Sequence, residues 1–122
     1  MAEHLQNNSF VINLNSSIKE AMASITDNQR GTVAVVDDDF YLQGIVADGD
    51  IRRAMLRGAA MVTPVSKILN TNPVVLSKSD FEAGKAEEIF KEESSINILP
   101  VVDESNKLID VAIRSPQKRR EL

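Results

Sequence analysis

The segment "VAVVDDDFYLQGIVADGD", residues 33–50, recurs later in the chain as "LPVVDESNKLIDVAIRSP", residues 99–116. In each copy an apolar run leads into an acidic or polar turn, and a second apolar run follows. This pattern predicts two β-strands joined by a tight connection. An internal repeat of this hairpin therefore organises the chain. One constant offset aligns Val35 with Val101, Val36 with Val102, Asp37 with Asp103 and Leu42 with Leu108.

A helix is expected before each hairpin. Ahead of the first copy, Ser17 and Glu20 have the spacing of a capping box. Apolar residues follow at intervals of three and four: Ile18, Ala21, Met22 and Ile25. Ahead of the second copy Asp80 is the expected cap, and the apolar face is less regular: Phe81, Gly84, Ile89 and Phe90. A short apolar piece precedes each helix, at 10–14 and 73–76, and predicts a further strand.

The end of each hairpin is expected to differ. After the first copy, Asp50 is expected to open a second helix, which Gly58 would stop. The second copy has Pro116 at the equivalent place, so a closing helix there must begin later. Between the copies, Thr63 as a cap and Pro64 at the first helical position predict a packed connector. The expected boundaries are 1–9 (N-terminal extension), 10–58 (first repeat), 59–72 (connector), 73–116 (second repeat) and 117–122 (basic tail or linker).

Composition narrows the possible functions. The 122 residues suffice for one compact domain, and the absence of cysteine excludes disulfides and thiolate metal sites. A net charge of −4 and the lack of tryptophan argue against nucleic-acid binding. Neither a membrane-length apolar run nor a secretory signal is present, which predicts a cytoplasmic protein with no membrane partner.

Taken together, the two repeats resemble a CBS-domain pair, also called a Bateman module. The resemblance rests on the "VVD" turn in both copies, on "LPVVDE", and on "GIVADGDIRR" at residues 44–53. It implies an α/β (α+β) fold of tandem repeats, each strand-helix-strand-strand-helix, related by a pseudo-twofold axis. Their small sheets would face each other with helices outside. It also implies a regulatory region rather than an enzyme, and a homodimer.

The sequences of three further segments indicate a particular group within the CBS family. The segments "DGDIRRAMLRG", "ILNTNPVV" and "LIDVAI" look most like the CBS pairs attached to bacterial sugar-phosphate nucleotidyltransferases. The expected function is therefore to sense an adenosine nucleotide (AMP, ADP or ATP) in the cleft between the repeats, and so to regulate an attached enzyme of that kind. No catalytic cofactor is expected.

The first hairpin carries the candidate nucleotide motif. It matches the family pattern except at Ala47, where the usual hydroxyl is missing. Independently of the family, a carboxylate at a helix start, such as that of Asp50, can accept hydrogen bonds from both hydroxyls of a ribose. Glycines allow close approach of the backbone, and arginines can donate to a phosphate. The candidate residues are Gly44, Ile45, Ala47, Asp48, Gly49, Asp50, Arg52 and Arg53.

The resemblance places the other half of the pocket in the connector and the second repeat. Asn72, Pro73 and Val74 would border the base, and Asn97, Ile98 and Pro100 would complete its sandwich. The second copy departs from the motif, with Asp110 for the glycine, Ile113 at the hydroxyl position and Pro116 at the acid position. At most one competent nucleotide site is expected.

Other interpretations stay open. Asp50 could simply cap a helix, and Arg52 and Arg53 could lie on a solvated face. The departures at Ala47 and Pro116 favour a dimerisation scaffold whose pockets have degenerated. A third hypothesis uses Asp48 and Asp50 as an Asp-x-Asp metal site of a transferase, although a Gly-rich phosphate loop and a paired histidine base are missing from the sequence.

Overall fold

The structure is a computed structural model that describes residues 8–115. The first repeat contains β1 (Val11–Asn13), α2 (Ile18–Asn28), β2 (Thr32–Val36), β3 (Leu42–Ala47) and α3 (Asp48–Leu56). A short 3₁₀ helix, η1 (Val65–Lys67), lies in the connector. The second repeat contains β4 (Leu76–Ser77), α4 (Lys78–Glu82), α5 (Ala86–Glu92), β5 (Ile98–Val102) and β6 (Leu108–Ile113).

Some expectations fall outside these residues. They are most of the N-terminal extension, Pro116 with any closing helix of the second repeat, and the basic tail at 117–122. Within residues 8–115, no helix combines the length and hydropathy needed to cross a membrane.

Each repeat forms its own three-stranded sheet. The strand orders are β1-β2-β3 and β4-β5-β6, with a parallel first pair and an antiparallel hairpin in both. Val35 pairs with Gly44 and Val101 with Asp110, and the register shifts directly after each valine. The structure therefore confirms that the hairpin is repeated, down to the position of its irregularity.

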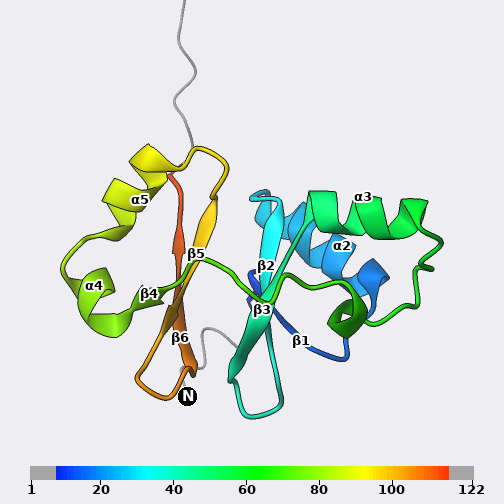
Figure 1. Cartoon of the computed structure of the whole chain (residues 1–122), viewed down its shortest axis with the longest axis horizontal. Helices are drawn as coiled ribbons and strands as arrows, with labels where there is room; N and C mark the ends of the chain where they lie inside the picture. The colour runs from blue at the N-terminus through cyan, green and yellow to red at the C-terminus, as the bar shows by residue number, and fades with distance from the viewer. Residues whose placement is uncertain (1–7, 116–122) are drawn as a thin grey trace, which may run out of the picture.

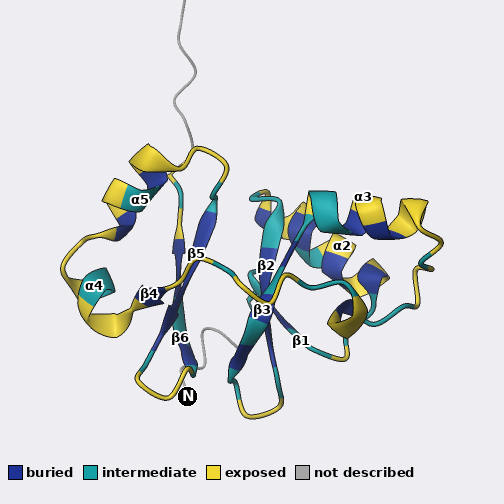
Figure 2. Ribbon diagram, in the orientation of Figure 1, coloured by how far each residue is buried: buried dark blue, intermediate teal, exposed yellow. Residues whose placement is uncertain are grey.

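The two sheets face each other, and the helices lie outside them, on opposite flanks of the molecule (Figure 1). The burial colouring shows dark strands in the middle and exposed outer faces on the helices (Figure 2). Apolar side chains from both hairpins form the core between the sheets, because alternate residues of each strand point inward. These buried residues are Ala34, Val36, Leu42, Ile98, Val102, Leu108 and Val111.

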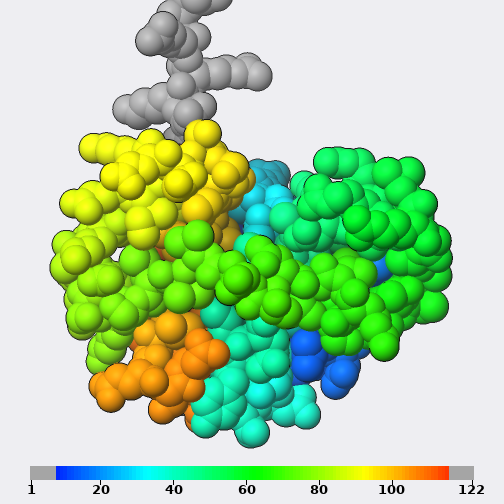
Figure 3. Space-filling view, viewed as in Figure 1, coloured from blue at the N-terminus to red at the C-terminus, as the bar shows by residue number. Residues whose placement is uncertain are grey.

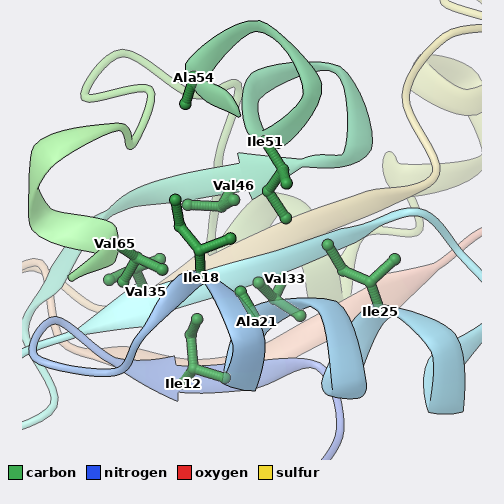
Figure 4. Packing of buried hydrophobic residues seen from close by; sticks show 10 residues of the cluster. All are labelled: Ile12, Ile18, Ala21, Ile25, Val33, Val35, Val46, Ile51, Ala54 and Val65. Carbon is green, nitrogen blue, oxygen red and sulfur yellow. The ribbon is translucent and has the colours of Figure 1, made fainter. Parts of the chain in front are cut away.

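The first repeat has a second core beneath its helices, and α2 forms as the sequence predicts. Ser17 Oγ accepts a hydrogen bond from the Glu20 amide, and the Glu20 carboxylate accepts one from the Ser17 amide, both at 3.1 Å. Ile18, Ala21 and Ile25 pack with β2, β3 and α3 (Figure 4). Met22, expected on the same face, lies at its edge and is 40% exposed.

Three sequence predictions about helix starts need correction. The cap of α4 is Ser77 rather than Asp80, because Ser77 Oγ accepts from the Asp80 amide. Helix α3 begins at Asp48 rather than Asp50, since Ala47 is still extended. In the connector, Pro64 precedes η1 instead of opening it, and Thr63 accepts from the Ala60 amide rather than capping η1.

The second repeat is less regular than predicted. Gly84, with a φ of +77°, interrupts the expected helix and separates α4 from α5. A residue with a positive φ turns the chain out of the helical path, so the residues after it cannot continue the helical hydrogen bonds. The expected strand at 73–76 is reduced to Leu76 and Ser77, which frees residues 73–75 from the sheet.

Candidate functional site

A cavity of about 200 Å³ lies between the two repeats. Seven predicted residues line it: Ile45, Ala47, Asn72, Pro73, Val74, Asn97 and Ile98. The prediction missed four more lining residues: Thr32, Asn70, Ser95 and Ile96. The structure thus brings together one hairpin, the connector and the start of the other hairpin, three segments that are distant in sequence.

The connector reaches this cavity because it pairs with β3. The Ile45 amide donates to the Asn70 carbonyl at 3.0 Å, and the Asn70 amide donates to the Ile45 carbonyl at 2.8 Å. Any side chain at Gly44 would collide with the Asn70 carbonyl and the Leu69 side chain. Glycine at 44 is therefore a packing requirement. Figure 3 shows the connector, in green, crossing the face of the molecule from one repeat to the other.

Arg114 holds the opposite wall. Its amide donates to the Asn97 carbonyl at 2.8 Å, and its Nε donates to the Ile96 carbonyl at 2.9 Å. The guanidinium also donates to the Glu93 carbonyl and lies over the Phe90 ring. Sequence reasoning missed Arg114, because nothing in its local pattern shows that it returns to the loop before β5.

The chemistry of this cavity suits a flat heterocycle. Most of its wall is aliphatic, and the polar groups are amides and hydroxyls. None of the lining residues that the structure describes carries a charged side chain. Pockets for whole drug-sized ligands span roughly 300–1,000 Å³, so this one fits a single ring system better than an entire nucleotide.

Asp50 lines a separate neighbouring cavity of about 390 Å³. Its Oδ2 accepts from the Ala47 amide and its Oδ1 from Arg53 Nη2, each at 2.9 Å. Asp50 thus both stabilises the start of α3 and pairs with Arg53. The Asp50 side chain is 22% exposed and that of Arg53 57%, so solvent weakens the ion pair.

The walls of the two cavities are linked at two places. Ala47 lines the first cavity and Asp50 the second, and the hydrogen bond above joins these residues. In the connector, the consecutive residues Leu69 and Asn70 face the second and first cavity respectively.

The remaining predicted residues lie elsewhere. Asp48 and Arg52 line a third cavity of about 500 Å³, together with Met22 and Met55. Gly49 lies beneath the guanidinium of Arg53.

Two predicted site residues do not line these cavities, and the geometry does not support the metal hypothesis. Gly44 and Pro100 are buried and line none of the three. Asp48 and Asp50 line different cavities, which separates the two carboxylates that an Asp-x-Asp metal site would need together. Among residues 8–115, no group of three or more histidine, cysteine or acidic side chains could hold a metal ion.

Comparison with known proteins places this architecture in a family. The CBS domain family matches residues 2–57 and 65–112, which include both hairpins. The chain belongs to the CBS domain family. As a CBS pair it is a regulatory module without catalytic function of its own.

Among curated proteins, the chain is 37% identical over 95 residues to the arabinose 5-phosphate isomerase GutQ of Escherichia coli strain K12. The match covers 78% of this chain and 29% of the isomerase. This chain thus corresponds to under a third of the length of that relative.

Solved structures share the fold. The putative acetoin utilization protein AcuB from Vibrio cholerae has a TM-score of 0.72 at 21% identity, covering 84% of this chain and 75% of that one. The CBS domain protein PAE2072 from Pyrobaculum aerophilum, complexed with AMP, has a TM-score of 0.66 at 21% identity. The match covers 91% of this chain and 84% of that one. At this identity the likeness concerns the fold alone.

Proposed function

We propose that this CBS pair binds an adenosine nucleotide across the two adjoining cavities and so regulates a catalytic domain joined to it. The observation that carries the proposal is a hydrogen bond between Ala47 and Asp50. It links the wall of a largely aliphatic cavity to the wall of a second cavity, which Asp50 and basic side chains line. A base, a ribose and a phosphate need these three environments in that order. The complex of PAE2072 with AMP supports the choice of ligand.

Different residues would bind the base, the ribose and the phosphate of the ligand. The base enters the cavity lined by Ile45, Val74 and Ile98, and Asp50 receives the ribose hydroxyls. Arg53 already donates to Asp50 Oδ1, and a diol that replaces this hydrogen bond would free the guanidinium for a phosphate. The missing hydroxyl at Ala47 weakens binding by about 0.5–1.5 kcal/mol, the usual net value of one hydrogen bond.

The proposal also concerns the class of enzyme that the module regulates. The resemblance in sequence predicts a nucleotidyltransferase, whereas GutQ is an isomerase of a sugar phosphate. Both act on sugar phosphates, and we propose an enzyme of that substrate class. The cytoplasmic location stays a prediction.

Thermal unfolding with and without ligand tests the site. AMP, ADP or ATP at a hundredfold over its Kd should stabilise the protein by about 2.7 kcal/mol, with no requirement for Mg²⁺. Asp50→Ala should lose affinity about tenfold or more, since it removes a charged acceptor. Asp80→Ala is the matched control, because Asp80 is also the third residue of its helix and pairs with a basic side chain, Lys85.

Two outcomes would contradict this assignment. Absence of stabilisation by all three nucleotides would favour the scaffold hypothesis, which gains support from Asp50 already being occupied by Ala47 and Arg53. Equal binding by the wild type and Asp50→Ala would place the nucleotide elsewhere.

We also propose a homodimer through the outer face of α2 and α3. Met22, Met55 and Leu56 are exposed there around the third cavity, and Leu56 is 82% exposed. Asp48 and Arg52 line the same cavity and carry opposite charges. In a twofold dimer, Asp48 of each copy could therefore pair with Arg52 of the other copy. Sedimentation velocity should show a dimer that Leu56→Glu dissociates, and a monomeric wild type at high concentration would contradict it.

A further inference from the structure

Two arginines join the repeats beside the cavity between them. Arg30 lies in the turn between α2 and β2, and its Nε donates to the Arg114 carbonyl at 3.1 Å. Arg30 is itself held in place by Asn28, whose Oδ1 accepts from the Arg30 amide at 2.7 Å. Asn28 is buried, and its Nδ2 donates to the carbonyls of Ser9 and Thr32. The first repeat therefore holds Arg30 in a turn that is fixed by a buried side chain.

The contact between the arginines connects the two walls of this cavity. Thr32, two residues after Arg30, lines the cavity from the first repeat. Ile96 and Asn97 line it from the second repeat, and their carbonyls accept from the side chain and the amide of Arg114. The hydrogen bond from Arg30 to Arg114 thus joins the two backbone segments that form opposite walls.

The repeats are also joined at the turns of their hairpins. Lys107 lies over the ring of Tyr41, with its Nζ 5.2 Å from the ring centroid. Asn106 Nδ2 donates to the Leu42 carbonyl at 3.1 Å. These four residues are not among those that line the cavity. A side-chain contact between the repeats can therefore be removed either beside the cavity or away from it.

A flat ring between aliphatic side chains needs walls at a defined spacing. The attraction between non-bonded atoms falls steeply with distance, and a gap of about 0.5–1 Å loses roughly a quarter to a half of it. Walls that keep their spacing before the ligand enters also lose less entropy on binding. A side chain that fixes this spacing therefore raises affinity without touching the ligand.

We propose that Arg30 and Arg114 are positioning residues, which fix the separation of the two cavity walls and so raise the affinity for the base of the ligand. This inference rests on the proposed function, because it takes the base to lie in this cavity. Arg114 holds the wall of the second repeat, and Arg30 holds Arg114 against the first. A bound base stabilises the contact between the arginines in return, and with it the end of β6, because coupling in binding free energy is reciprocal.

Isothermal titration calorimetry of adenosine and of AMP with the whole chain tests the inference. Arg30→Ala should raise the Kd of both ligands about fivefold, the factor for one hydrogen bond of ordinary net strength. Lys107→Ala is the matched control, because it removes the same charge and a contact between the repeats at the turns. It should change either Kd by less than about twofold. A loss confined to AMP would mean that Arg30 acts on the phosphate through its charge, and would overturn the inference.

A double variant tests whether Arg30 acts through Arg114. Arg114→Ala alone should raise Kd more than Arg30→Ala does, because it releases the carbonyls of Glu93 and Ile96. Adding Arg30→Ala should then raise Kd by less than about twofold further, since the wall that Arg30 holds is already loose. Effects that multiply would show two independent residues and would overturn the coupling. If Arg114→Ala does not fold, the comparison of Arg30→Ala with Lys107→Ala decides.

Amide hydrogen exchange without ligand separates this inference from the proposed function. Arg30→Ala should speed exchange at residues 93–98 about fivefold, and Lys107→Ala should leave it unchanged. If neither adenosine nor AMP binds the wild type, the proposed function fails, and the exchange result still shows whether the arginines fix the wall. Unchanged exchange in Arg30→Ala would overturn the inference even if both ligands bind.

Discussion

The two repeats are alike at the turns of their hairpins. Asp37 Oδ1 accepts from two backbone amides of its own turn, and Asp103 Oδ1 does the same in the second turn, at 2.9–3.0 Å. The turns also bond to each other reciprocally. The Leu42 amide donates to the Asn106 carbonyl, and the Leu108 amide donates to the Phe40 carbonyl. This end of the molecule keeps the symmetry of the duplication.

The opposite ends of the hairpins differ. Gly44 of the first repeat makes room for the connector, whereas Asp110 stands at the equivalent place in β6. Asp48 is exposed at the start of α3, whereas its equivalent Arg114 turns back onto the loop before β5. Arg30 of the first repeat donates in turn to the Arg114 carbonyl at 3.1 Å.

This difference is consistent with one proposed site in a duplicated fold. In the second repeat, arginine side chains satisfy the backbone carbonyls at the end of the hairpin. In the first, the connector builds a cavity there, and Asp50 stands beside it. The symmetric turns link the two sheets, and the proposed nucleotide site lies at the asymmetric ends.

The largest expected effect is at the glycine of the first hairpin. Gly44→Asp gives the first repeat the residue of the second and should cost about 3 kcal/mol of unfolding free energy, because the side chain collides with backbone. Asp110→Gly, the reciprocal change, should cost less, about 1–2 kcal/mol, because it removes the acceptor of the Val111 amide hydrogen bond and adds backbone freedom within a strand. Urea unfolding measures both. Equal costs would show that the connector does not depend on this close approach.

The next largest loss of stability is expected at Arg114 in the second repeat. Arg114→Ala should destabilise the protein by about 2 kcal/mol, since its guanidinium bonds to the carbonyls of Glu93 and Ile96 and covers Phe90. Asp48→Ala, at the equivalent position, should change stability by less than about 0.5 kcal/mol because Asp48 is exposed. Chemical denaturation of the two variants in parallel checks this, and a larger loss for Asp48→Ala would reverse the assignment of roles.

Local patterns explain why so much of the fold was predictable. The two "VVD" turns and the Ser17–Glu20 capping box depend on residues only a few positions apart, and the structure confirms both hairpins and α2. The errors have local causes too. Asp80 and Ser77 are both good caps, and the sequence alone did not decide between them.

The candidate site was predictable only in part. Family resemblance selected seven of the eleven described residues that line the cavity between the repeats. The pairing of Ile45 with Asn70 and the return of Arg114 to Ile96 join distant segments, and no local spacing signals them. The Asp50–Arg53 ion pair could have been predicted from the sequence, because residues three apart on a helix are neighbours.

The smallest effect tests the symmetric half of the comparison. Asp37→Ala and Asp103→Ala should each cost about 1 kcal/mol, because each removes one carboxylate oxygen that accepts two amide hydrogen bonds. Asp39→Ala is the control, an acid of the same turn whose own carboxylate makes no such bond among the described contacts. Thermal unfolding compares the three variants.

The two losses should agree within about 0.5 kcal/mol, the limit within which independent sites are usually compared. A much larger loss for one turn would mean that the sheets are held mainly from that repeat. The reciprocal bonds of Leu42 and Leu108 argue for equality, since each turn supplies one donor and one acceptor to the other. Equal losses here, beside unequal losses at Gly44 and Asp110, would locate the divergence of the repeats at the ligand end alone.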